Sequence, residues 1–170
     1  CEAFGLQDIH TIEEICGFKP NTNIVRGTDK WLDIHRHRST PEAIAHLREA
    51  GYRIVATTPH REDVTPPTFD VAKGPFALVF GTEHAGISED MVGAADECLR
   101  LPMYGFVESL NVSASAAILL HDLSVRLRST DLPWQLSPEE QDYMLFRWVM
   151  LSVRDAQRIL RKGFPDQPTP

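Results

Sequence analysis

The sequence predicts an α/β domain with a mostly parallel sheet and helices on both faces of that sheet. Two observations lead to this prediction: predicted strands alternate with predicted helices along the chain, and most of these strands are apolar throughout. Continuously apolar strands are typical of parallel sheets that are covered on both sides. With 170 residues, of which 42% are hydrophobic, the chain has the length and composition of one globular domain.

The first half of the chain predicts a strand, a helix and another strand. Residues 6–12 (LQDIHTI) form the first strand. The pair Thr40-Pro41 is typical of a helix start, and Gly51 ends that helix. Residues 53–58 (RIVATT) then form a buried strand, and the proline-rich residues 59–75 form a loop.

The second half continues the alternation and ends in two long helices. Strands are predicted at 76–81 and 97–102, with a short helix between them that Ser88 caps. Residues 109–127 form a helix that is rich in small residues, and residues 137–162 form a C-terminal helical extension that opens with a capping box. The apolar positions of that extension are expected to share one face: Met144, Leu145, Trp148, Leu151 and Ile159.

Charge is distributed unevenly along the chain. The net charge is −7, but residues 26–61 carry +3 and residues 62–97 carry −7. The first segment is therefore compatible with a basic surface for a polyanion, although an ordinary solvated face explains it equally well. Three scattered cysteines, without a C-x-x-C pair, indicate neither a disulfide framework nor a zinc site, so we expect a protein of the reducing cytoplasm.

A glycine loop, FGTEHAGI at 80–87, follows the strand at 76–81. A phosphate-binding P-loop needs Lys and Ser or Thr directly after its second glycine, whereas Gly86 is followed by Ile87 and Ser88. The dinucleotide motif G-x-G-x-x-G and the hydrolase motif G-x-S-x-G are also absent. The loop therefore suits a ligand that is cationic or that approaches bare backbone, rather than a nucleotide phosphate.

Two further stretches follow predicted strands and should meet this loop at the carboxyl edge of the sheet: 56–58 (ATT) and 101–113 (LPMYGFVESLNVS). Together, FGTEHAGIS and LPMYGFVESLNVSASAA resemble the second and third motifs of the SPOUT class of RNA methyltransferases, in the SpoU (TrmH) family. The segment LSPEEQDYMLFRW resembles the C-terminal helix of the branch that modifies a guanosine in the tRNA D-loop. The resemblance implies a deep trefoil knot in the C-terminal part of the α/β fold, and a homodimer.

The resemblance also implies a cofactor, S-adenosylmethionine, held by the three loops. Backbone groups at Thr57, Leu101 and Leu110 match the family's adenosine contacts, and Met103 lies in the same motif. Gly81 and Gly105 are expected to let the main chain approach the ligand. From the residues alone, Leu101 and Leu110 would be taken as core.

In this family the methyl group goes to a ribose 2′-hydroxyl. Asn111 and Ser109 match the family's polar pair, with a positioning role, and Glu83 matches an orienting glutamate. No metal is expected, because the leaving group is a neutral thioether. The family's catalytic arginine would lie two residues before Cys1, so we expect residues upstream of this sequence. The candidate RNA contacts are Arg26, Lys30, Arg36, Arg38, Arg126 and Arg128.

Two other functions stay open at this point. The same chemistry could act on ribosomal RNA, since the core motifs are shared. The chain could also be an inert RNA-binding relative that lacks the arginine.

Overall fold

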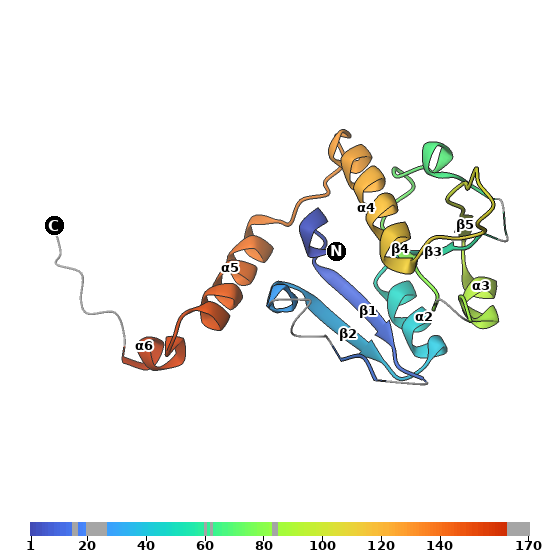
Figure 1. The fold of residues 1–170 in the computed structure, drawn as a ribbon. Helices are drawn as coiled ribbons and strands as arrows, with labels where there is room; N and C mark the ends of the chain where they lie inside the picture. Colours follow the sequence, from blue (N-terminus) through green and yellow to red (C-terminus); the bar gives the residue numbers. More distant parts are fainter. Residues whose placement is uncertain (15–16, 20–26, 60, 62, 83–84, 163–170) are drawn as a thin grey trace.

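Parallel strands and helices alternate along the chain (Figure 1). The computed structural model describes residues 1–14, 17–19, 27–59, 61, 63–82 and 85–162. The strands are β1 (Asp8–Ile12), β2 (Asp33–His37), β3 (Arg53–Thr57), β4 (Phe76–Val79) and β5 (Glu97–Leu99). The α-helices are α2 (Thr40–Glu49), α3 (Glu89–Ala94), α4 (Val112–Arg128), α5 (Pro138–Ser152) and α6 (Ala156–Lys162), and short 3₁₀ helices are η1 (Glu2–Phe4), η2 (Thr28–Trp31) and η3 (Pro66–Thr68).

Three strands form the larger sheet in the order β4-β3-β5, and both pairs are parallel. The central residues of β3, Ile54, Val55 and Ala56, are completely buried. A strand buried on both faces gains free energy from apolar side chains at every position, which explains its continuous apolar run. The predicted parallel arrangement is therefore confirmed for these strands.

Helices cover both faces of this sheet, as predicted. Successive side chains of a strand point to opposite faces, so Ile54 and Val55 enter different cores. Ile54 packs with residues of α2 and α3, and Val55 packs with residues of α4 and of the loop after η3. The buried partners of Ile54 are Ala43, Leu47 and Met91, and those of Val55 are Phe69, Val71, Leu99, Leu119 and Leu123.

An ion pair fastens β3 to β5 at their amino-terminal ends. Arg53 Nη1 lies 2.7 Å from Glu97 Oε1, and these side chains are only 16% and 14% exposed. The Arg53 guanidinium also lies over the rings of Phe69 and Phe76, at 5.3 and 5.7 Å from their centres. Aromatic faces attract the cation and help to offset its loss of water.

The smaller sheet pairs β1 with β2, again in parallel. The sequence predicts β1 but not β2, because four of the five residues in Asp33–His37 are charged or histidine. The register places Asp8 beside Asp33 and His10 beside His35, and α2 contacts both strands. Within the described residues, the strands therefore form two parallel sheets rather than the single sheet that the sequence predicts.

The C-terminal extension is two helices, not one. The predicted capping box is present: Glu140 N donates to Ser137 Oγ, and Ser137 N donates to Glu140 Oε2 at 2.8 Å. However, α5 ends at Ser152, and Asp155 has a left-handed backbone (φ 61°) before α6 begins. Asp tolerates this conformation and favours helix ends, so the helix breaks without a glycine or proline at this position.

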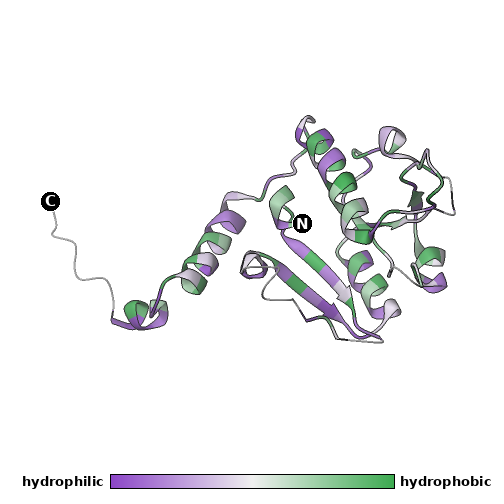
Figure 2. Cartoon of the chain, viewed as in Figure 1, coloured by the Kyte–Doolittle hydropathy of each residue, from purple (hydrophilic) through white to green (hydrophobic). Residues whose placement is uncertain are grey.

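Only one side of α5 packs on the body of the protein. Trp148 meets Trp31 edge to face at 5.6 Å, Arg147 pairs with Asp33, and Met144 is buried. Leu145, like other large apolar side chains of the extension, is exposed. The five apolar positions therefore do not share one face, which corrects the expectation. Figure 1 shows α5 and α6 extending from the body, and Figure 2 shows hydrophobic segments along them.

Candidate active site

The carboxyl ends of the three larger-sheet strands lie at one edge and are tied together. Thr57 Oγ1 donates to the carbonyl oxygen of Val79 at 2.7 Å, and Thr58 N donates to that of Leu99 at 3.2 Å. Loops therefore leave β3, β4 and β5 from the same edge, as predicted for loops that follow parallel strands. Thr57 lies at this edge with its side chain turned toward β4.

The glycine loop after β4 closes on itself. Thr82 N donates to Gly86 O at 3.0 Å, and Gly86 N donates to Thr82 O at 2.9 Å. A Cβ on Gly81 would lie 2.1 Å from the carbonyl carbon of Gly86. Gly81 is thus required by the loop's own closure, and its predicted contact with a ligand stays a prediction. Glu83 lies outside the described residues.

The loop after β5 runs from the core to the surface. Leu101 packs against the core on the α4 side of the sheet, and Met103 is half-buried. Leu110 is 38% exposed, so it is not the core residue that its type alone suggests. Around Gly105 there is open space, because a Cβ there would meet no atom within 4 Å.

Asn111 begins α4 as its N-cap. Its Oδ1 accepts a hydrogen bond from Ser113 N at 2.8 Å, and its carbonyl oxygen accepts one from Ser115 N at 3.0 Å. This cap fixes the Asn111 side chain beside the end of the third loop. Ser109 lies two residues earlier, is exposed, and does not cap the helix.

The basic candidates fall into two groups. Lys30 Nζ lies 4.3 Å above the Trp31 ring, Arg36 Nη1 lies 3.3 Å from Glu13 Oε1, and Arg38 is exposed just after β2. These residues belong to η2, β2 and the turn that follows, while Arg26 lies outside the described residues. Half of the Arg36 side chain stays exposed, at 52%.

The second group has contacts within the chain. Arg126 donates to the carbonyl oxygens of Pro66 and Phe69 and holds the η3 turn against α4. Arg128 donates to Phe4 O at 2.9 Å and lies over the Trp134 ring. These contacts give both arginines a structural role, and an RNA contact for them stays a prediction.

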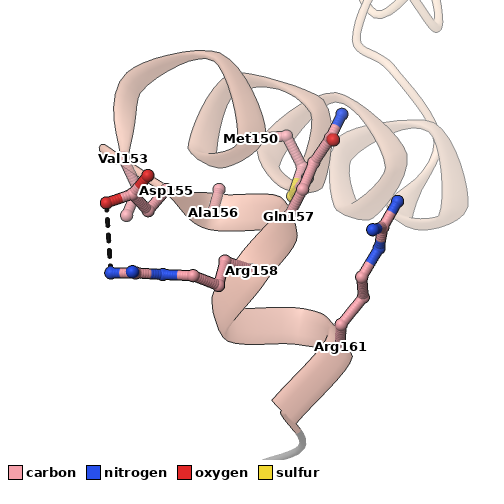
Figure 3. Close-up of a pocket in the computed structure, with 7 residues that line it drawn as sticks. All are labelled: Met150, Val153, Asp155, Ala156, Gln157, Arg158 and Arg161. Carbon is pink, nitrogen blue, oxygen red and sulfur yellow. Dashed lines mark hydrogen bonds and ion pairs between the residues drawn. The ribbon is translucent and has the colours of Figure 1, made fainter.

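Tyr104 and Phe106 flank Gly105 and are fully exposed, and neither is among the predicted site residues. Two aromatic side chains beside a glycine in a motif loop are the signal that would have selected them as candidates for ligand contact. A separate hollow of about 550 Å³ lies where α5 meets α6 and includes Asp155, Arg158 and Arg161 in its lining (Figure 3). Asp155 and Arg158 pair there at 3.2 Å, and none of the motif residues lines it.

In the described part of the chain, no group of three or more His, Cys, Asp or Glu residues is arranged to hold a metal ion. Among the helices described, none combines the length and apolar character that crossing a membrane requires.

A parallel α/β sheet whose loops leave one carboxyl edge is the arrangement of open α/β proteins, a class that binds ligands outside that edge. The sequence profile of the SpoU rRNA Methylase family matches residues 1–121. The chain belongs to this family.

Individual relatives agree with this assignment. A protein of Borreliella burgdorferi named tRNA (guanosine(18)-2′-O)-methyltransferase is 31% identical over 93% of this chain and 72% of its own length. The crystal structure of the A. aeolicus TrmH/SpoU tRNA modifying enzyme has a TM-score of 0.74 and 28% identity, over 91% of this chain and 80% of that one. The AdoMet-bound rRNA methyltransferase from Sinorhizobium meliloti has a TM-score of 0.65 and 26% identity, over 74% and 48%.

Proposed function

We propose that this protein transfers a methyl group from S-adenosylmethionine to a ribose 2′-hydroxyl of RNA, at a guanosine of the tRNA D-loop. The observation that carries the proposal is the joined carboxyl edge of β3, β4 and β5, from which the three motif loops leave. Family membership supports the chemistry, and the curated relative from Borreliella burgdorferi supports tRNA as the substrate.

The residues at this edge fit S-adenosylmethionine. Open space beside Gly105 leaves room for a ligand against the main chain, and the loop closed by Thr82 and Gly86 has no lysine for a phosphate. Leu101, Met103 and Leu110 offer apolar surface for an adenosine, while Thr57 stands where β3 ends. When bound, the cofactor supplies a methyl carbon that is activated by the positive sulfonium.

The chain's own residues position the reactants. The N-cap bond to Ser113 holds Asn111 rigidly at the start of α4, so its amide can orient the ribose or the third loop. Ser109, which is exposed nearby, is assigned to the same positioning role. We do not assign removal of the hydroxyl proton to Asn111 or Ser109. Glu83 is assigned only to orienting nearby polar groups.

We also propose that residues 1–170 form one methyltransferase domain, with 137–162 as a helical extension and with a trefoil knot in the loops around α4. Helix α4 packs against both η1, near the start of the chain, and η3, near its middle. These contacts support a single domain. An experimental chain trace in which α4 does not pass through a loop would refute the knot. We place the protein in the cytoplasm, where tRNA is modified.

The active form is proposed to be a homodimer. Exposed apolar side chains support this: Ile118 and Val125 on α4 are 44% and 54% exposed, and Leu145 and Phe146 on α5 are 59% and 54% exposed. Burying these side chains against a second copy would remove apolar surface from water and so favour association.

The test of the function is a methylation assay with the complete gene product. We expect labelled methyl groups from S-adenosylmethionine to appear on a tRNA transcript as 2′-O-methylguanosine in the D-loop. A ribosomal RNA transcript is the matched substrate, because an rRNA methyltransferase also aligns with this chain. Methylation of rRNA alone would move the substrate assignment, and methylation of neither RNA would support an inert relative. Calorimetry with S-adenosylmethionine separates loss of binding from loss of chemistry.

A further inference from the structure

Four histidines gather between the smaller sheet and α2. His10 comes from β1, His35 and His37 from β2, and His46 from α2. The His10 ring stacks on that of His35 with centres 4.6 Å apart and planes 14° apart. The His46 ring lies 5.2 to 5.6 Å from each of the other three. The register explains the meeting: His10 is the direct partner of His35, and alternate residues share a face of the sheet.

Hydrogen bonds within the cluster depend on its protonation. His10 Nδ1 and His37 Nε2 are 3.0 Å apart, so one nitrogen donates and the other accepts. Once both of these nitrogens carry protons, two donors face each other and the bond is lost. His37 is buried, at 5% exposure, so water cannot easily replace that bond.

Among the described residues, few acids act on the cluster. Asp8 Oδ1 lies 2.8 Å from His35 Nε2, and Glu42 of α2 acts on His37. Asp8 is about half exposed, at 45%, which weakens its attraction for a buried cation. Two acids facing four imidazoles cannot neutralise the cluster if all four rings become charged.

We propose that His10, His35, His37 and His46 form an acid-sensitive joint that holds the β1–β2 pair against α2 at neutral pH and loosens on acidification. Neutral rings can stack and share the His10–His37 hydrogen bond. Protonated rings at these distances repel one another, and the nearest strands and helix must separate to hydrate them.

The direction of the pH dependence follows from the buried members. Burial, followed by the neighbouring His35, His37 and His46, lowers the pKa of His10 to about 4, although Asp8 opposes the shift. Burial also lowers the pKa of His37, with His46 adding to the effect and Glu42 opposing it. The unfolded chain binds protons at a pKa of about 6.5, so it takes up more protons than the folded chain below that pH. This contribution to stability is present above about pH 6.5 and is lost as pH falls toward about 4.

The test compares urea unfolding of the full chain at pH 7.5 and pH 5.0. For each histidine that remains neutral when folded, acidification should raise the unfolding equilibrium constant by roughly 30-fold. His10→Phe keeps a flat ring but cannot be protonated, so its acid sensitivity should be smaller by about that factor. His121→Gln is the matched control, because His121 lies on α4 beside Phe4 and outside the cluster. Equal acid sensitivity in His10→Phe and the wild type would overturn the proposal.

Two measurements on the unmodified protein keep the proposal testable if the variant does not fold. NMR of the imidazole nitrogens should find His10 neutral at pH 5.5. A His10 titration near pH 6.5 would contradict the proposal. Hydrogen exchange at pH 5.0 should show amides of β1 and β2 losing protection relative to those of β3. Uniform loss across both sheets would show general acid unfolding instead.

Discussion

Gly81 has no room for a side chain, because any Cβ there would collide with the backbone of Gly86. We expect Gly81→Ala to force the 81–86 loop open, to cost at least about 2 kcal/mol of stability, and to abolish S-adenosylmethionine binding in calorimetry. Gly93→Ala in α3 is the control, since a Cβ on Gly93 meets nothing within 4 Å. Full cofactor affinity in Gly81→Ala would mean that the closed loop does not shape the binding site.

Asn111 combines a structural role with a proposed catalytic one, and two substitutions separate them. Asn111→Ala removes the cap and should cost about 1 kcal/mol of stability, while the single-turnover methylation rate of the complete protein falls by roughly 100-fold. Asn111→Ser restores a capping oxygen, so stability should return but the rate should not. Recovery of the rate in Asn111→Ser would reduce Asn111 to a helix cap.

At the scale of elements, η2, β2 and the turn after β2 are expected to carry the RNA contacts. Arg36→Gln and Arg38→Gln should each weaken tRNA binding and reduce the slope of log affinity against log salt by about 0.7 to 0.9. Lys73→Gln is a close control: Lys73 and Arg36 are 56% and 52% exposed, and each pairs with a glutamate at 3.4 or 3.3 Å. Slopes that stay unchanged in both arginine variants would place the RNA on another surface.

At the scale of the whole molecule, we expect two copies to associate. Light scattering at micromolar concentration should give twice the chain mass of 19.2 kDa. Phe146→Glu puts a charge on the exposed side of α5 and should shift the mass toward the monomer. Glu139→Gln, an exposed polar change on the same helix, should leave the dimer intact. A monomer mass for the folded wild type would remove the dimer proposal.

Most elements could be predicted because their residues carry local signals. The apolar run around Val55 predicts β3, and the Ser137 capping box predicts the start of α5. Strand β2 lacked such a signal, because its histidines face other histidines that only the fold brings together. The break at Asp155 likewise depends on a left-handed backbone conformation that the neighbouring residue types do not indicate.

The candidate site could also be predicted only in part. Family motifs indicated the three loops, and the strand register confirms that these loops leave one edge. The steric need for glycine at position 81 could not be predicted from the sequence, because a Cβ there would collide with Gly86, which only the folded loop brings close. Exposure was equally hidden: Leu110 has the residue type of a core position and yet faces solvent in part.

The Arg53–Glu97 pair has a consequence for how this protein can change. It joins β3 to β5 at the ends opposite those that lead into the motif loops. The ion pair and the loops that we propose bind the cofactor and RNA therefore lie at opposite ends of the same three strands. Substitutions at exposed loop positions such as Tyr104 and Phe106 should leave the Arg53–Glu97 contact intact, because distant sites act nearly independently. Under the proposed function, new RNA targets can then arise by gradual substitution at such positions.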